Sequence, residues 1–104
     1  MNFDEILTQA NHFRNSLGQA KNLLDKKTVE VSGGKGVVTV IITGSGIIKE
    51  IRLASEAMNL LGKDELEATL TATVNEAYSR SKKLAAGIMF EITGFDPNSF
   101  SEMF

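Results

Sequence analysis

Apolar side chains recur every three or four positions over the first quarter of the chain. This alternation of three and four is a heptad pattern, which places all of these side chains on one face of a helix. Acidic residues open the stretch and Lys26 and Lys27 close it, as the helix dipole favours. We therefore predict a long helix over about residues 2–27 whose apolar stripe packs against another helix, in its own chain or in a second copy. The stripe consists of Phe3, Ile6, Ala10, Phe13, Leu17, Ala20 and Leu24.

Three short runs rich in β-branched residues follow within residues 28–53. The loops between them are short and contain glycine, so the runs predict a three-stranded antiparallel meander with hairpin connections. The central run is apolar at nearly every position, which is typical of a strand covered on both faces. The predicted strands cover residues 28–32, 37–43 and 47–53, and the loops cover residues 33–36 and 44–46.

The first of these loops, in the stretch SGGKGVV at residues 32–38, places Lys35 among glycines and so resembles a phosphate-binding loop. Such a loop needs its lysine and a hydroxyl residue at the start of a helix, where backbone N–H groups converge on the anion. Here a β-branched run follows the lysine, which favours a strand. We interpret the stretch as a hairpin turn in which Lys35 is exposed to solvent.

A second long helix is predicted over about residues 64–92. Asp64 is expected to cap its first turn, with Glu67 three residues later as in a capping box. Gly94 and Pro97 supply the stop. Residues 94–104 are expected to form an irregular tail that contains three phenylalanines.

Length and composition favour a single α+β domain over residues 1–104 that would gain stability from a partner subunit. The chain has no cysteine, and neither a signal peptide nor an apolar run long enough to span a membrane. We therefore expect a cytoplasmic protein with no membrane partner. The only histidine, His12, has no evident catalytic partner, because Asp4 and Glu5 are explained as charges at a helix N-terminus. We expect no catalytic residue, no metal, no cofactor and no small-molecule substrate.

The order and spacing of these elements resemble the YbaB/EbfC family of bacterial nucleoid-associated proteins. The similarity covers nearly the whole chain and is carried by residues 36–40, Gly44, residues 51–53, residues 74–77 and residues 89–97. It implies a tweezer-like homodimer whose sheets form the body and whose long helices project as arms, and it implies binding to double-stranded DNA in the nucleoid.

The chain also departs from the family pattern in three segments. Residues 54–56 read Ala-Ser-Glu where the family typically has a proline, residues 68–74 carry less charge than usual, and residues 94–98 replace a Gly-Gly and Pro-Gly pattern.

The resemblance directs attention to basic side chains on the two helices that could contact phosphates. Arg14 and Lys21 are seven residues apart and share a helical stripe, and Lys82 and Lys83 belong to the densest basic group of the second helix. No motif in the sequence predicts contacts that would recognise particular DNA bases. The predicted DNA-binding residues are Arg14, Lys21, Lys26, Lys27, Arg80, Lys82 and Lys83. The predicted core or dimer residues are Phe13, Leu17, Val38, Val40, Ile42 and Ile51.

The sequence also fits an alternative to DNA binding. Short groups of charge on helices are usually a solvated face, and the net charge is −2. The acidic second half and the phenylalanines Phe95, Phe100 and Phe104 fit a non-catalytic protein-interaction or structural dimer that does not bind DNA.

Overall fold

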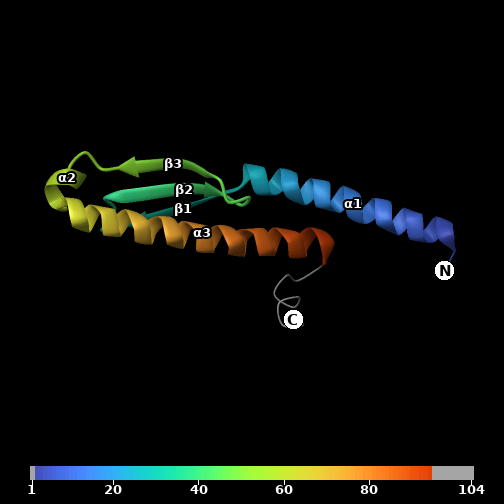
Figure 1. Cartoon of the computed structure of the whole chain (residues 1–104). Helices are drawn as coiled ribbons and strands as arrows, with labels where there is room; N and C mark the ends of the chain where they lie inside the picture. Colours follow the sequence, from blue (N-terminus) through green and yellow to red (C-terminus); the bar gives the residue numbers. More distant parts are fainter. Residues whose placement is uncertain (1, 95–104) are drawn as a thin grey trace, which may run out of the picture.

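The computed structural model describes residues 2–94 and shows an α+β fold (Figure 1). The predicted order of long helix, three-stranded antiparallel meander and long helix is confirmed. A single helical turn, α2, precedes the last helix and has no counterpart in the sequence prediction. The predicted tail lies outside the described residues, except for Gly94. The elements are α1 (Phe3–Lys26), β1 (Thr28–Gly33), β2 (Val38–Thr43), β3 (Ile48–Leu53), α2 (Ala57–Leu60) and α3 (Lys63–Thr93).

The core lies between α3 and one face of the sheet. The strand order is β1-β2-β3, and Val31 of β1 stands opposite Val40 of β2. Val38, Val40 and Ile42 alternate along β2 on this face and are fully buried, in a cluster that includes Ala77 of α3. Thr39 and Ile41 lie on the other face of β2 and are only half-buried. In the single chain, β2 is therefore fully covered on one face and not on both.

The loop between β1 and β2 is a hairpin turn, as predicted. Gly34, Lys35 and Gly36 adopt φ values of 60°, 59° and 89°, and the Gly36 N–H donates to the Gly33 carbonyl at 3.2 Å. Glycine adopts this left-handed region without steric cost, whereas lysine rarely does. Lys35 is exposed at the turn and is not at a helix start.

The two ends of α3 differ in how well the sequence predicts them. Gly94 is left-handed, with φ 74°, and its N–H donates to the Phe90 carbonyl at 2.8 Å, which confirms the predicted stop. The prediction of Asp64 as the N-cap was wrong. The cap is Gly62, which has no side chain to accept a hydrogen bond, and the helix has already begun when Asp64 is reached. Asp64 in the first turn still suits the helix dipole.

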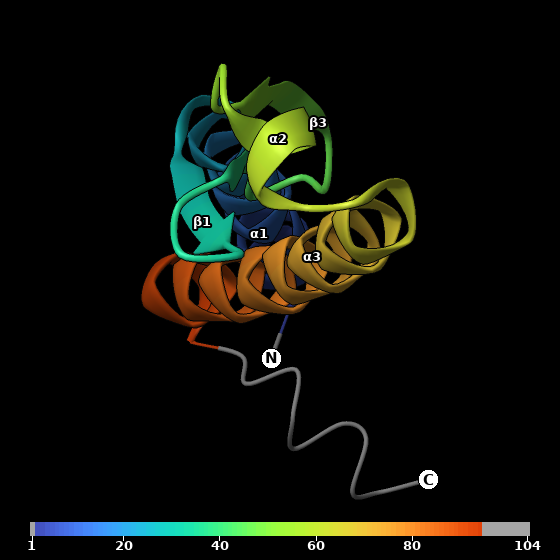
Figure 2. The same cartoon turned by 90° about the vertical axis from the view of Figure 1, so that its left-hand side faces the viewer.

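The chain is elongated, with extents of 68 × 28 × 15 Å. Its radius of gyration is 19.0 Å, whereas a compact chain of this length would have about 13 Å. Figures 1 and 2 show the cause: α3 runs under the sheet, and the first half of α1 projects past the end of α3. Ala20 is the only buried residue of α1, and Phe3 is 72% exposed. Among residues 2–94, no helix is long and apolar enough to cross a membrane.

Candidate nucleic-acid interface

The turn between β2 and β3 holds the two long helices together. The Ser81 hydroxyl of α3 donates a hydrogen bond of 2.7 Å to the carbonyl oxygen of Thr43. The N–H of the next residue, Gly44, donates to the Lys27 carbonyl at the end of α1, at 3.0 Å. Gly44 also packs directly on Leu24, since a Cβ atom at Gly44 would lie 3.2 Å from the Leu24 carbonyl oxygen. Two adjacent residues, Thr43 at the end of β2 and Gly44 at the start of the turn, thus anchor the middle of α3 and the end of α1.

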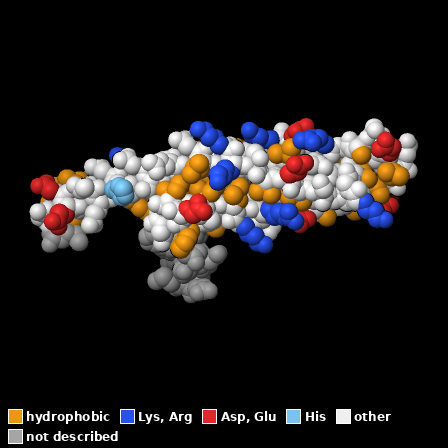
Figure 3. Space-filling model, turned by 180° about the vertical axis from the view of Figure 1, so that it is seen from behind, with side chains coloured by type: hydrophobic (Ala, Val, Ile, Leu, Met, Phe, Trp, Pro, Cys, Tyr) orange, Lys and Arg blue, Asp and Glu red, His pale blue; other side chains and the backbone are white. Residues whose placement is uncertain are grey.

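This junction brings together two of the basic groups that the sequence singles out. Lys27 follows α1, and Lys82 directly follows the anchored Ser81. All four lysines around the junction are exposed, and we refer to them as the turn cluster. In the face drawn in Figure 3, most Lys and Arg side chains lie over the middle of the molecule, with some acidic side chains among them, while the end formed by the start of α1 carries acidic side chains. The turn cluster consists of Lys26, Lys27, Lys82 and Lys83.

No member of the turn cluster forms an ion pair with any residue of the described segment 2–94. The nearest acidic residue in sequence, Asp25, is exposed and also lacks such a pair. Exposed like charges without ion-pair partners create a local positive potential. Because lysine ammonium groups bind phosphate as point charges, a polyanion is the partner that this surface fits.

The other predicted DNA-binding residues lie apart from this junction or are already paired. Arg14 and Lys21 are exposed on α1. Arg14 precedes Lys26 by twelve residues, so the two lie about 18 Å apart along the helix axis. Arg80 donates to the Glu76 carboxylate at 2.9 Å, one helical turn earlier, and so is partly neutralised within its own helix.

One further lysine lies near the junction and was missed by the sequence analysis. Lys49 is exposed at the start of β3, where the strand register shifts. The sequence contains no signal for this position, because a register shift depends on how β3 pairs with β2.

The six residues predicted for the core or the dimer divide into two groups. Three of them, on β2, are fully buried: Val38, Val40 and Ile42. The remaining three are exposed in the single chain, at 45% for Phe13, 39% for Leu17 and 44% for Ile51.

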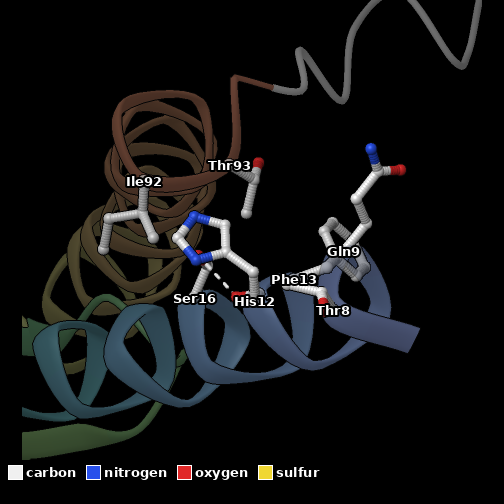
Figure 4. A pocket seen from close by; sticks show the side chains of 7 residues that line it. All are labelled: Thr8, Gln9, His12, Phe13, Ser16, Ile92 and Thr93. Carbon is white, nitrogen blue, oxygen red and sulfur yellow. Dashed lines mark hydrogen bonds between the residues drawn. The ribbon is translucent and has the colours of Figure 1, made fainter. Parts of the chain in front are cut away.

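His12 borders a hollow of about 410 Å³ between the projecting half of α1 and the end of α3. Figure 4 shows its ring on the side of α1 that faces Ile92. The other lining residues are Thr8, Gln9, Phe13, Ser16 and Thr93, so no described carboxylate lines the hollow to pair with the imidazole. Within residues 2–94, no group of three or more His, Asp or Glu side chains could hold a metal ion.

The chain is thus an elongated α+β protein with exposed lysines, free of ion pairs among residues 2–94, on both long helices beside the β2–β3 turn. Comparison with known sequences identifies its family. Residues 1–95 match the YbaB/EbfC DNA-binding family, and the chain belongs to that family. Its function is therefore DNA binding.

Individual relatives agree with this assignment. A nucleoid-associated protein of Ruminiclostridium cellulolyticum is 32% identical over 93 residues, which cover 89% of this chain and 81% of the relative. Another nucleoid-associated protein, from Thermodesulfovibrio yellowstonii, is 34% identical over 91 residues, which cover 88% of this chain and 80% of the relative. The crystal structure of an uncharacterized Helicobacter pylori protein shares the fold, with a TM-score of 0.77 over 88% of this chain and 96% of that chain, at 15% identity.

Proposed function

We propose that the protein is a nucleoid-associated homodimer that binds double-stranded DNA mainly through backbone phosphates. The observation that carries this proposal is the turn cluster, in which four exposed lysines flank the β2–β3 turn without ion pairs among the described residues. The family supplies the identity of the polyanion, and the names of the relatives support the nucleoid as the location.

Phosphate contact is favoured over the reading of bases by the residue types at the junction. Sequence is read by bidentate side chains such as arginine, asparagine and glutamine on base edges, whereas lysine on phosphate fixes position without reading sequence. The turn cluster contains lysine only, and Arg80 nearby is paired with Glu76. Binding of this kind depends strongly on salt, because each neutralised phosphate releases counterions.

The uncovered part of the sheet supports the homodimer. Directly opposite residues of antiparallel strands lie on one face. Leu53 stands opposite the buried Val38 and Ile51 opposite the buried Val40, yet they are 48% and 44% exposed. The reason is that α3 packs across β1 and β2 and leaves β3 uncovered, as Figure 2 shows from the end.

An aromatic side chain of α3 is exposed as well. Tyr78 is 41% exposed and lies one helical turn after Val74, which packs against the core. Large exposed apolar patches mark protein–protein interfaces. A second copy placed there would cover Ile51, Leu53 and Tyr78 and would bring a second turn cluster into one assembly.

The protein as proposed acts without catalysis. The imidazole of His12 faces the hollow between α1 and α3, where no described carboxylate lies to pair with it, and the nearby Ser16 hydroxyl donates to the His12 backbone carbonyl at 3.1 Å. We assign the protein no substrate and no cofactor, and its chemistry is reversible binding.

The test is a titration of a fluorescently labelled duplex with the purified full chain, followed by anisotropy at several salt concentrations. Sedimentation equilibrium on the same sample reports the oligomeric state. The proposal predicts a dimer that binds the duplex and loses affinity as salt rises. A folded dimer that fails to bind even at low salt would contradict DNA binding and leave the protein-interaction alternative, which the exposed apolar residues of α1 would then serve.

A further inference from the structure

Lys49 occupies an irregular position in the sheet. Ile41 of β2 pairs with Glu50, but the next residue, Ile42, pairs with Ile48, so Lys49 is the extra residue of a β-bulge. An extra residue of this kind is left out of the strand ladder and re-aims its side chain, and such bulges occur next to functional sites more often than elsewhere. Lys49 is exposed and forms no ion pair within residues 2–94.

The bulge lies next to the turn that anchors both helices. The turn occupies residues 44–46 and β3 begins at Ile48, so Lys49 is five residues after Gly44, which bonds to the end of α1. In Figure 1, the connection between β2 and β3 lies beside the end of α1 and above α3. Lys49 therefore adds a third chain segment to a basic surface that α1 and α3 already supply.

The projecting half of α1 has a different charge. Residues 3–15 carry Asp4 and Glu5 against one base, Arg14. A duplex laid along that half would meet two carboxylates and one guanidinium from each protomer. Acids also occur in the body, but there they are outnumbered: residues 25–53 carry five bases against three acids, Asp25, Glu30 and Glu50, and Glu50 is paired with Arg52 at 3.1 Å. Electrostatics thus favours the body of the molecule over the projecting half of α1 as the contact surface.

We propose that Lys49 is a further DNA-phosphate contact and that the duplex crosses the body at the β2–β3 turn rather than following the projecting half of α1. This inference rests on the proposed function. Each phosphate contact contributes about 0.9 to the slope of log affinity against log salt. Removing one exposed charge contact is expected to weaken binding about two- to fivefold per protomer.

The experiment compares Lys49→Gln with two matched variants that each remove one exposed positive charge. Lys35→Gln lies in the β1–β2 turn, at the opposite end of the sheet, and Arg14→Gln lies on the projecting half of α1; like Lys49, both wild-type residues are exposed and form no ion pair within residues 2–94. Lys49→Arg keeps the charge at the bulge. Circular dichroism and sedimentation confirm that each variant is folded and assembled like the wild type before its salt dependence is measured.

We expect Lys49→Gln to weaken binding and flatten the salt slope, Lys49→Arg to retain both, and the two control variants to bind like the wild type. A wild-type affinity for Lys49→Gln, or an equal loss for Arg14→Gln, would overturn this inference while the proposed function stands. Failure of the wild type itself to bind the duplex would overturn the proposed function and this inference with it.

Discussion

The Ser81 hydroxyl donates a hydrogen bond of 2.7 Å to the carbonyl oxygen of Thr43, and both residues are 2% exposed. This bond joins the middle of α3 to the β2–β3 turn across 38 residues of sequence. A serine in a helix interior usually bonds back to its own helix or points to solvent. Here its hydroxyl satisfies a buried carbonyl of another element and fixes the position of Lys82 and Lys83 relative to α1.

Replacing this hydroxyl should therefore destabilise the fold. We expect Ser81→Ala to lower the free energy of unfolding by about 0.5–1.5 kcal/mol, because the buried Thr43 carbonyl loses its donor from α3 and keeps only the Gly46 N–H, at 3.1 Å. Urea denaturation at a fixed protein concentration measures the change. Ser79→Ala is the matched control, since Ser79 is exposed on the same helix and its loss should change stability by less than about 0.5 kcal/mol. Equal stability of the two variants would contradict the role assigned to Ser81.

The close approach of the β2–β3 turn to α1 leads us to predict that a side chain at Gly44 is destabilising. A Cβ atom at Gly44 would lie 3.0 Å from Leu24 Cδ2 and 3.3 Å from Leu24 Cα, so the backbone of α1 or of the turn would have to move. We expect Gly44→Ala to destabilise the protein by about 1–3 kcal/mol. Thermal unfolding followed by circular dichroism measures the shift.

Gly18, in the interior of α1, is expected to respond to alanine in the opposite way to Gly44. No atom lies within 4 Å of a Cβ placed there, and the residue is in the interior of α1. Gly18→Ala should stabilise the protein by about 0.5–1 kcal/mol through helix propensity alone. A rise in melting temperature for Gly44→Ala would contradict the close packing of the turn on Leu24.

The proposed dimer surface predicts the effect of a charge on β3. Ile51→Glu should leave the protomer folded, because this side chain is already partly in water, and should shift the protein toward monomer. Burying an unpaired carboxylate in an apolar interface is strongly unfavourable. Analytical ultracentrifugation measures the change.

Leu60→Glu on α2 is the control for this variant, since Leu60 is 65% exposed and lies outside the proposed surface. It should sediment like the wild type. Unchanged dimerisation of Ile51→Glu would place the interface elsewhere.

Local patterns predict most of the fold, and long-range contacts explain what they miss. The heptad spacing of α1, the glycines of the first hairpin and the stop at Gly94 are each encoded within a few residues. The error at the start of α3 is also local, since Gly62 and Asp64 both suit an N-cap and the chain uses the earlier one.

The site was harder to predict from sequence. Lys26, Lys27, Lys82 and Lys83 are recognisable as basic groups, but their common location depends on the bonds from Ser81 to Thr43 and from Gly44 to Lys27. Lys49 joins them through a register shift that no spacing reveals. Arg80 was predicted to contact DNA, but its ion pair with Glu76 distinguishes it from the unpaired lysines.

The most direct test of the account is the salt dependence of duplex binding by the double variant Lys82→Ala/Lys83→Ala. Its control is Lys35→Gly/Lys63→Ala, which removes two exposed charges at the other end of the sheet, of which Lys63 is paired with Glu67 at 3.9 Å. The glycine at position 35 stands at a left-handed position where it is unstrained. A dimer of the first variant loses two lysines per protomer. We predict that its log–log salt slope flattens by roughly 3.6 if all of these lysines contact phosphates, while the control keeps the wild-type slope. Equal slopes for the wild type and both variants would contradict the claim that the turn cluster binds DNA.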